Sequence, residues 1–193
     1  MGINLNKLST EELGILFPIK IVDYNPLWKN LFVSEKKTIQ NAVGRNNIVR
    51  IEHIGSTAVP GLCAKPTIDM LVQIKDNADT TLITKKLKKA GYHFISKPEN
   101  PPPHIMYSKG YSVKGYSGQA YHIHLRYRGD WDEILFRNFL IRNPKSTREY
   151  AELKIKLAVD FMNDREQYTK NKTEFINRII KIAKEKLKDI EKY

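Results

Sequence analysis

The stretch Glu52 to Asp69, EHIGSTAVPGLCAKPTID, decides our interpretation of the fold. A β-rich run, Ile48 to Ile54, leads into Gly55-Ser56, and a mostly apolar run, Thr67 to Ile74, follows the loop. Glycine has no Cβ, so a phosphate can approach the backbone at Gly55, and Ser56 adds a hydroxyl beside the backbone N–H groups. The pattern predicts two strands joined by a structured loop with a helical turn, which a phosphate could approach.

Asp69 is an acid embedded in the second of these strands. A buried carboxylate is costly unless a metal or a cation meets it, so we interpret Asp69 as a site residue. The alternative is that Asp69 caps the strand or pairs with Lys65 or an arginine. Lys65 could itself contact a phosphate from the loop, although a solvated lysine is the more ordinary case.

A later strand-like run carries two histidines. The period of two in His122-Ile123-His124-Leu125-Arg126 places His122, His124 and Arg126 on one face. If this strand neighbours Asp69, the two imidazoles and the carboxylate could form a metal triad. Alternatively, His122 or His124 acts as a general base with Arg126 facing phosphate, or the histidines only form hydrogen bonds.

Arg137 lies in an otherwise apolar helical segment, Ile134 to Ile141. A half-buried arginine requires an anionic partner, which we expect to be a carboxylate such as Asp69 or a ligand phosphate. Glu52 could be a metal ligand, but pairing with Arg50 or a lysine is the more ordinary expectation.

The remaining pattern is that of an α/β chain up to about residue 128, followed by helices. A short β-rich segment, Pro18 to Asp23, precedes the first helix, which begins near Pro26 and ends before Gly44. We then expect a helix over Thr80 to Ala90 and a stiff loop over Lys97 to His104. Two strands, around Ile105 to Tyr111 and Tyr121 to Arg128, should be joined through Gly115 to Gly118. Beyond them we expect two helices with capping boxes, Asp130 with Glu133 and Ser146 with Glu149, and a last helix from about Thr173. We expect one domain over residues 1–193, with the helical part, about 130–193, packed on the core.

Composition sets the class of protein and its partners. The 193 residues are 41% hydrophobic and carry 33 basic and 21 acidic side chains, a net charge of +12. Such a surface attracts polyanions, nucleic acid included. The alternative is that the lysines, which are spread along helical stretches, serve solubility. No apolar run approaches the roughly 20 residues of a membrane helix, so we expect no membrane partner. The single Cys63 and the absence of a signal-peptide pattern at residues 1–16 favour the cytoplasm.

The string His53-Ile54-Gly55-Ser56-Thr57-Ala58-Val59-Pro60-Gly61-Leu62, with Ala64-Lys65-Pro66 and Ile68-Asp69, resembles the GrpB family. The segments His122 to Leu125, Trp131, Phe136 to Leu140, Tyr150 to Lys154 and Leu157-Ala158 are similar to later blocks of that family. The resemblance covers about residues 18–185. It implies the fold of the nucleotidyltransferase superfamily typified by DNA polymerase beta, a mixed sheet flanked by helices, with C-terminal helices.

In that superfamily the Gly-Ser turn holds the nucleotide phosphates, and acids on two strands bind two divalent metals. The resemblance therefore implies phosphate binding by Gly55 and Ser56 and metal binding by Asp69. This sequence departs from the pattern at Leu71, where a second acid is expected on the same face, and Gln73 is no carboxylate.

Three hypotheses follow. The first is a metal-dependent (Mg²⁺ or Mn²⁺) nucleotidyltransferase that moves a nucleoside monophosphate from an NTP to an unidentified acceptor. Its catalytic and metal-binding residues would be Asp69, His122 and His124. Its nucleotide- or phosphate-binding residues would be Gly55, Ser56, Lys65, Arg126 and Arg137. The second is a non-catalytic nucleotide- or RNA-binding module, which Leu71 supports. The third, a scaffold that recruits a partner enzyme, is conceivable from family members fused to a coenzyme A biosynthesis kinase.

Overall fold

The computed structural model describes residues 8–96, 103 and 105–190. Its elements in chain order are α1 (Thr10–Leu16), α2 (Leu27–Val43), η2 (Arg45–Asn47), β1 (Ile48–Ile54), η3 (Ser56–Ala58), β2 (Thr67–Ile74), α3 (Thr80–Lys89), β3 (His93–Ser96), β4 (Ile105–Ser112), β5 (Gly115–Tyr127), α4 (Asp132–Arg142), α5 (Pro144–Asp160) and α6 (Arg165–Ile190).

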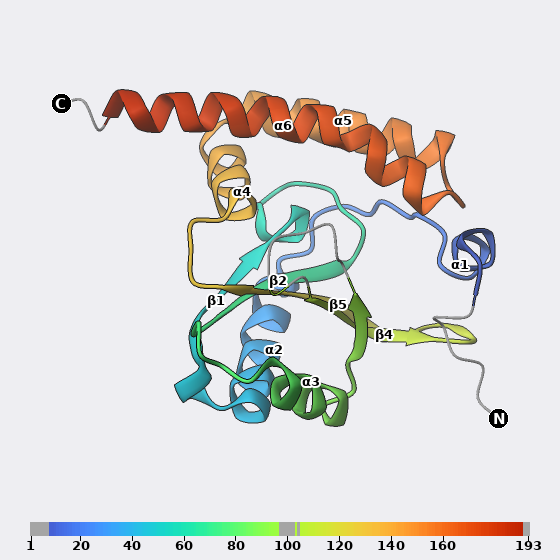
Figure 1. Ribbon diagram of the computed structural model, residues 1–193. Helices are drawn as coiled ribbons and strands as arrows, with labels where there is room; N and C mark the ends of the chain where they lie inside the picture. Colours follow the sequence, from blue (N-terminus) through green and yellow to red (C-terminus); the bar gives the residue numbers. More distant parts are fainter. Residues whose placement is uncertain (1–7, 97–102, 104, 191–193) are drawn as a thin grey trace.

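The five strands form one mixed sheet in the order β1-β2-β5-β4-β3. The central pair, β2 and β5, is parallel, whereas β1–β2, β5–β4 and β4–β3 are antiparallel. Helices α2 and α3 lie on one side of this sheet, and α4, α5 and α6 lie on the other (Figure 1). The mixed α/β class expected from the sequence is confirmed.

The main hydrophobic core fills the side of the sheet that α2 and α3 cover. It joins Trp28 and Ile39 of α2 and Leu87 of α3 to alternate strand residues such as Met70 and Ile123, all nearly or completely buried. Because strand side chains alternate between faces, the residues between these apolar positions point to the opposite side of the sheet. That side carries Asp69, His122 and His124.

A second hydrophobic cluster attaches the C-terminal helices to the loop after β1. Val59 and Leu62 of this loop pack with Phe139 of α4, Tyr150 of α5 and Ile179 of α6. The packing places the C-terminal helices beside the polar face of the sheet. Along the described part of the chain, no helix is both long enough and apolar enough to cross a membrane.

Several sequence expectations about elements are confirmed. The strands β1 and β2 have the predicted bounds, and the loop between them contains the predicted helical turn, η3. Helix α2 begins after Pro26 and ends at Gly44, and α3 ends just before Gly91. The Lys97 to His104 segment lies outside the described residues except for Pro103.

The Pro18 to Asp23 segment precedes α2 as expected and forms one isolated bridge, between Val22 and Ala64. Two expectations are wrong. Helix α1 precedes this segment, so the helix near Pro26 is not the first. The Gly115 to Gly118 stretch belongs to β5 itself, since Gly115 pairs with Ser112 across a tighter hairpin.

Both predicted capping boxes are also wrong. Helix α4 follows Trp131 rather than Asp130, and α5 begins at Pro144, whose missing N–H suits a first helical turn; neither has a side-chain cap. The last helix begins at Arg165, about two turns before Thr173, because the Asp164 side chain accepts a hydrogen bond from Gln167 N.

Candidate functional site

The sheet register brings the predicted acid and the two histidines together. Asp69 of β2 is the direct partner of His122 on the parallel strand β5, and Leu71 is the partner of His124. His122 Nδ1 lies 3.1 Å and His124 Nε2 3.5 Å from Asp69 Oδ1. The side chains of Asp69, His122 and His124 are 27%, 15% and 23% exposed, so a ligand can reach them from solvent.

Gly55 holds the turn against the Asp69 carboxylate. Its φ is +70°, and a Cβ at this position would lie 2.6 Å from Asp69 Oδ2, so only glycine combines this backbone with this contact. Two hydrogen bonds also hold the turn in place. His53 Nε2 lies 3.0 Å from Thr57 Oγ1, and Thr57 Oγ1 donates to Thr67 O, so η3 is joined to both strands.

The protonation states at this cluster follow from its contacts. Burial alone would raise the pKa of Asp69, but hydrogen bonds from His122 and His124 outweigh it and hold that pKa well below its usual range. Burial lowers the pKa of His122, although Asp69 opposes the shift. At neutral pH the cluster therefore holds an ionised carboxylate and a neutral His122.

Tyr111 of β4 extends the cluster by one hydrogen bond. Its hydroxyl lies 2.9 Å from His122 Nε2, and burial raises the pKa of Tyr111 to about 12, so the phenol keeps its proton. With Asp69 ionised, His122 donates from Nδ1 to Asp69 and accepts at Nε2 from Tyr111. The three side chains form a continuous chain of hydrogen bonds, Tyr111 to His122 to Asp69.

This arrangement does not fit the metal triad considered from the sequence. Both ring nitrogens of His122 are engaged, one by Asp69 and the other by Tyr111, so that imidazole has no lone pair free for a cation. Leu71, where a second acid is expected, is fully buried. Within the described residues, no group of three or more His, Cys, Asp or Glu side chains has an arrangement that could hold a metal ion.

The two arginines assigned to phosphate are bound to protein groups. Arg137 of α4 donates from Nη1 to Glu52 Oε2 at 2.9 Å and to His53 O at 2.6 Å, so its anionic partner is Glu52. Arg126 is only 4% exposed and donates to Leu125 O, with its guanidinium over the Trp131 ring.

Helix α6 supplies cations that the sequence interpretation missed. Lys65 lies in the loop before β2, and its Nζ is 5.3 Å from the centre of the Tyr168 ring; Lys172 Nζ is 4.3 Å from the same ring. Arg165 begins the same helix face and donates to Phe17 O at 2.8 Å. A sequence signal existed for this helix: Asp164 and Gln167 have the spacing of a capped helix start.

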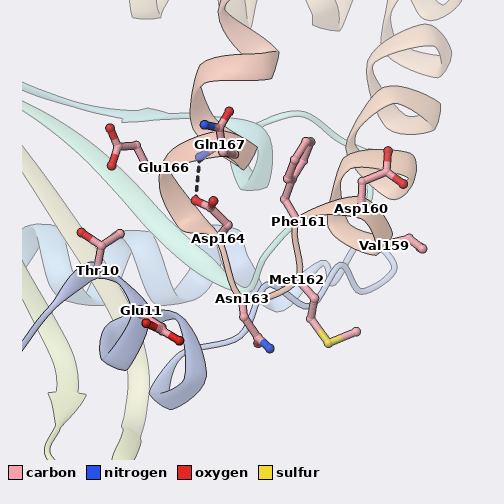
Figure 2. A pocket seen from close by; sticks show the side chains of 10 residues that line it. All are labelled: Thr10, Glu11, Val159, Asp160, Phe161, Met162, Asn163, Asp164, Glu166 and Gln167. Atoms are coloured by element: carbon pink, nitrogen blue, oxygen red, sulfur yellow. Dashed lines mark hydrogen bonds between the residues drawn. The ribbon is translucent and has the colours of Figure 1, made fainter.

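A large cavity lies elsewhere, between α1 and the turn that joins α5 to α6. Its volume is about 660 Å³. Its lining residues include Glu11, Asp160, Asp164 and Glu166 (Figure 2). Four acids repel phosphate, and the Asp164 carboxylate already caps α6. The cavity is therefore a poor candidate for the anion site predicted from the sequence.

The fold and the site define a mixed α/β protein with an acid–imidazole cluster on the central parallel strands of its sheet. The family model described as GrpB protein matches residues 18–182. The chain belongs to the GrpB family.

Relatives of known sequence and structure agree with this assignment. The chain is 37% identical over 164 residues to a UPF0157 protein of Pseudomonas aeruginosa, covering 84% of this chain and 66% of that protein. It is 32% identical to the glutamate-rich protein GrpB of Alkalihalophilus pseudofirmus, over 83% of this chain and 92% of that one. The crystal structure of the conserved protein GrpB from Enterococcus faecalis superimposes with a TM-score of 0.75 at 30% identity, covering 87% of this chain and 99% of that chain.

A dephospho-CoA kinase of Mycolicibacterium paratuberculosis shows a weaker similarity. It is 23% identical over 171 residues, which cover 77% of this chain and 42% of that protein.

Proposed function

We propose that this GrpB-family protein is a nucleotidyltransferase that binds a nucleoside triphosphate beside Asp69 and transfers the nucleoside monophosphate to an acceptor hydroxyl. The observation that carries the proposal is the Tyr111–His122–Asp69 hydrogen-bond chain held against the Gly55 turn. The resemblance to the nucleotidyltransferase superfamily supports the choice of reaction, because its Gly-Ser turn is the phosphate-binding element.

In the proposed reaction His122 is the general base. Asp69 keeps the proton on Nδ1, so Nε2 can accept the proton of an acceptor hydroxyl that takes the place of the Tyr111 hydroxyl. The acceptor oxygen forms a bond to the α-phosphorus as the bond to the bridging oxygen of the β-phosphate breaks. Pyrophosphate leaves with the electron pair, and the proton remains on His122. Asp69 is a positioning residue in this scheme.

A second candidate is a nucleotide-binding module without turnover. Leu71 favours it, because a carboxylate that the superfamily uses for metal binding is replaced by a buried apolar side chain. The divalent cation expected from the resemblance stays a prediction, and no step here depends on it.

Two measurements separate these candidates. ATP is titrated calorimetrically with and without Mg²⁺ or Mn²⁺, and pyrophosphate release is followed with a panel of hydroxyl acceptors. For the transferase we expect release that rises with pH through an apparent pKa below the ordinary histidine value, and that His122→Gln abolishes while ATP still binds. ATP binding without release across the panel supports the module, and no ATP binding under any condition overturns both.

A further inference from the structure

Three positive side chains come together from two distant segments of the chain, and the charge of Asp69 acts on two of them, Lys65 and Lys172. Arg165, Tyr168 and Lys172 are spaced three and four residues apart on α6 and therefore share one helix face. The loop before β2 adds Lys65, so that two ammonium groups flank the single buried ring of Tyr168, at 5.3 Å and 4.3 Å. We call Lys65, Arg165 and Lys172 the α6 cation cluster.

The α6 cation cluster has no carboxylate of its own. Among the described residues, none of its members forms an ion pair with an Asp or Glu side chain within 4.0 Å. The acid whose charge acts on both lysines is Asp69, and that carboxylate is already engaged by His122 and His124. The negative charge of Asp69 offsets only part of the charge of the three cations, so the cluster keeps an excess of positive charge.

This charge is costly to the folded protein. Burial, followed by repulsion from Arg165 and Lys172, lowers the pKa of Lys65 to about 7, while Asp69 opposes the shift. Burial also lowers the pKa of Lys172 to about 8, with Asp69 opposing and Arg165 adding to the shift. An anion with several negative charges would relieve both the repulsion and the lost hydration.

We propose that Lys65, Arg165 and Lys172 bind the di- or triphosphate chain of a nucleotide, so that α6 completes the site that β2 and β5 begin. That the ligand is a nucleotide rests on the proposed function; that the cluster binds a phosphate chain does not. A compact polyphosphate suits the cluster better than RNA does, because its three cations are half-buried at one place rather than spread along an exposed face.

The test uses the whole protein and three probes: ATP, inorganic tripolyphosphate and adenosine. We expect tripolyphosphate to bind and to compete with ATP, and adenosine to bind far more weakly. Lys172→Gln and Arg165→Gln should each weaken ATP and tripolyphosphate about ten-fold or more, as expected for the loss of a charged hydrogen bond. The matched control is Lys170→Gln, an exposed lysine on the same helix, which should leave both affinities unchanged.

Thermal unfolding of each variant separates lost binding from lost folding. Lys172→Gln removes a repelled charge, so its melting temperature should equal or exceed that of the wild type. Arg165 also bonds to Phe17 O, and Arg165→Lys provides a second variant that keeps the charge and should recover part of the affinity.

Each outcome bears on one proposal. ATP binding that is unchanged in Lys172→Gln and Arg165→Gln overturns the cluster as a phosphate site and leaves the nucleotide proposal standing. Tripolyphosphate binding that depends on Lys172, without any ATP binding, supports the cluster and overturns the nucleotide. An RNA oligonucleotide that displaces tripolyphosphate and depends equally on Lys170 overturns the compact site.

Discussion

Asp69 and His122 face each other across the parallel β2–β5 pair, with Oδ1 and Nδ1 3.1 Å apart. The contact joins strands that are 53 residues apart in sequence. It fixes the ionised state of the carboxylate and the orientation of the imidazole at the same time, so its removal should change both stability and pH dependence.

Asp69→Asn should lower the free energy of unfolding at pH 7 by about 1–3 kcal/mol, because His122 and His124 lose an ionised acceptor. The folded-state pKa of Asp69 is depressed, so its stabilisation is fully present above the unfolded-state pKa of about 4 and decreases progressively as the pH falls from there toward the folded-state pKa. Urea unfolding of both proteins at pH 7, 5 and 3 measures the difference, which should shrink at pH 3. Asp23→Asn, at an exposed position, is the control; a difference independent of pH would contradict the prediction.

Gly55→Ala should destabilise the protein and displace the Asp69 carboxylate. Its positive φ strains any side chain, and the new Cβ would lie 2.6 Å from Asp69 Oδ2. Gly61→Ala is a matched control, since Gly61 has a φ of +77° but no heavy atom within 4 Å of the added Cβ. We expect Gly61→Ala to lower the free energy of unfolding by about 1–2 kcal/mol from backbone strain alone, and Gly55→Ala to lower it by more. Equal losses would show that the carboxylate contact has no role.

The sequence was sufficient for the local parts of this site. Strand periodicity identified β1 and β2, and the Gly55 turn between them could be assigned from residue types alone. The alternation within β5 put His122 and His124 on one face, but the pairing of β5 with β2, and its register, depend on contacts between distant segments. The hypothesis that the strands are neighbours is confirmed only by the structure.

The partner of Arg137 and the α6 cation cluster illustrate what sequence reasoning missed. The need of Arg137 for an anion was correctly inferred, but nothing local selects Glu52, 85 residues away, over Asp69. The sequence did not place Lys172 on a helix, because the last helix was expected from about Thr173, one residue beyond it, whereas α6 begins at Arg165. The Ser9 and Glu12 capping box that begins α1 was also present in the sequence and was overlooked.

Tripolyphosphate binding should take up protons from solution. The pKa of Lys65 is lowered to about 7 and that of Lys172 to about 8, in a region that also holds Arg165 and Asp69. Both lysines are therefore partly neutral at pH 8, and they should be protonated when an anion binds. Calorimetry at pH 8 in buffers of different ionisation enthalpy should give an uptake of about one proton, and less at pH 6. Lys172→Gln should reduce the uptake, whereas Lys170→Gln should not. Proton release on binding would contradict the assignment.

The Glu52–Arg137 ion pair should be structural rather than part of the phosphate site. Its atoms are 2.9 Å apart, and the two side chains are 29% and 15% exposed, so breaking the pair leaves a half-buried charge without its partner. We expect Glu52→Gln and Arg137→Met each to lower the free energy of unfolding by about 1–3 kcal/mol. The loss of unfolding free energy in the double variant should be smaller than the sum of the two single losses, because the interaction can be lost only once. ATP and tripolyphosphate affinities, measured well below the melting temperature, should stay within about two-fold of wild type for Glu52→Gln. A ten-fold or greater loss of tripolyphosphate affinity in Arg137→Met, with Glu52→Gln unchanged, would instead return Arg137 to the phosphate site.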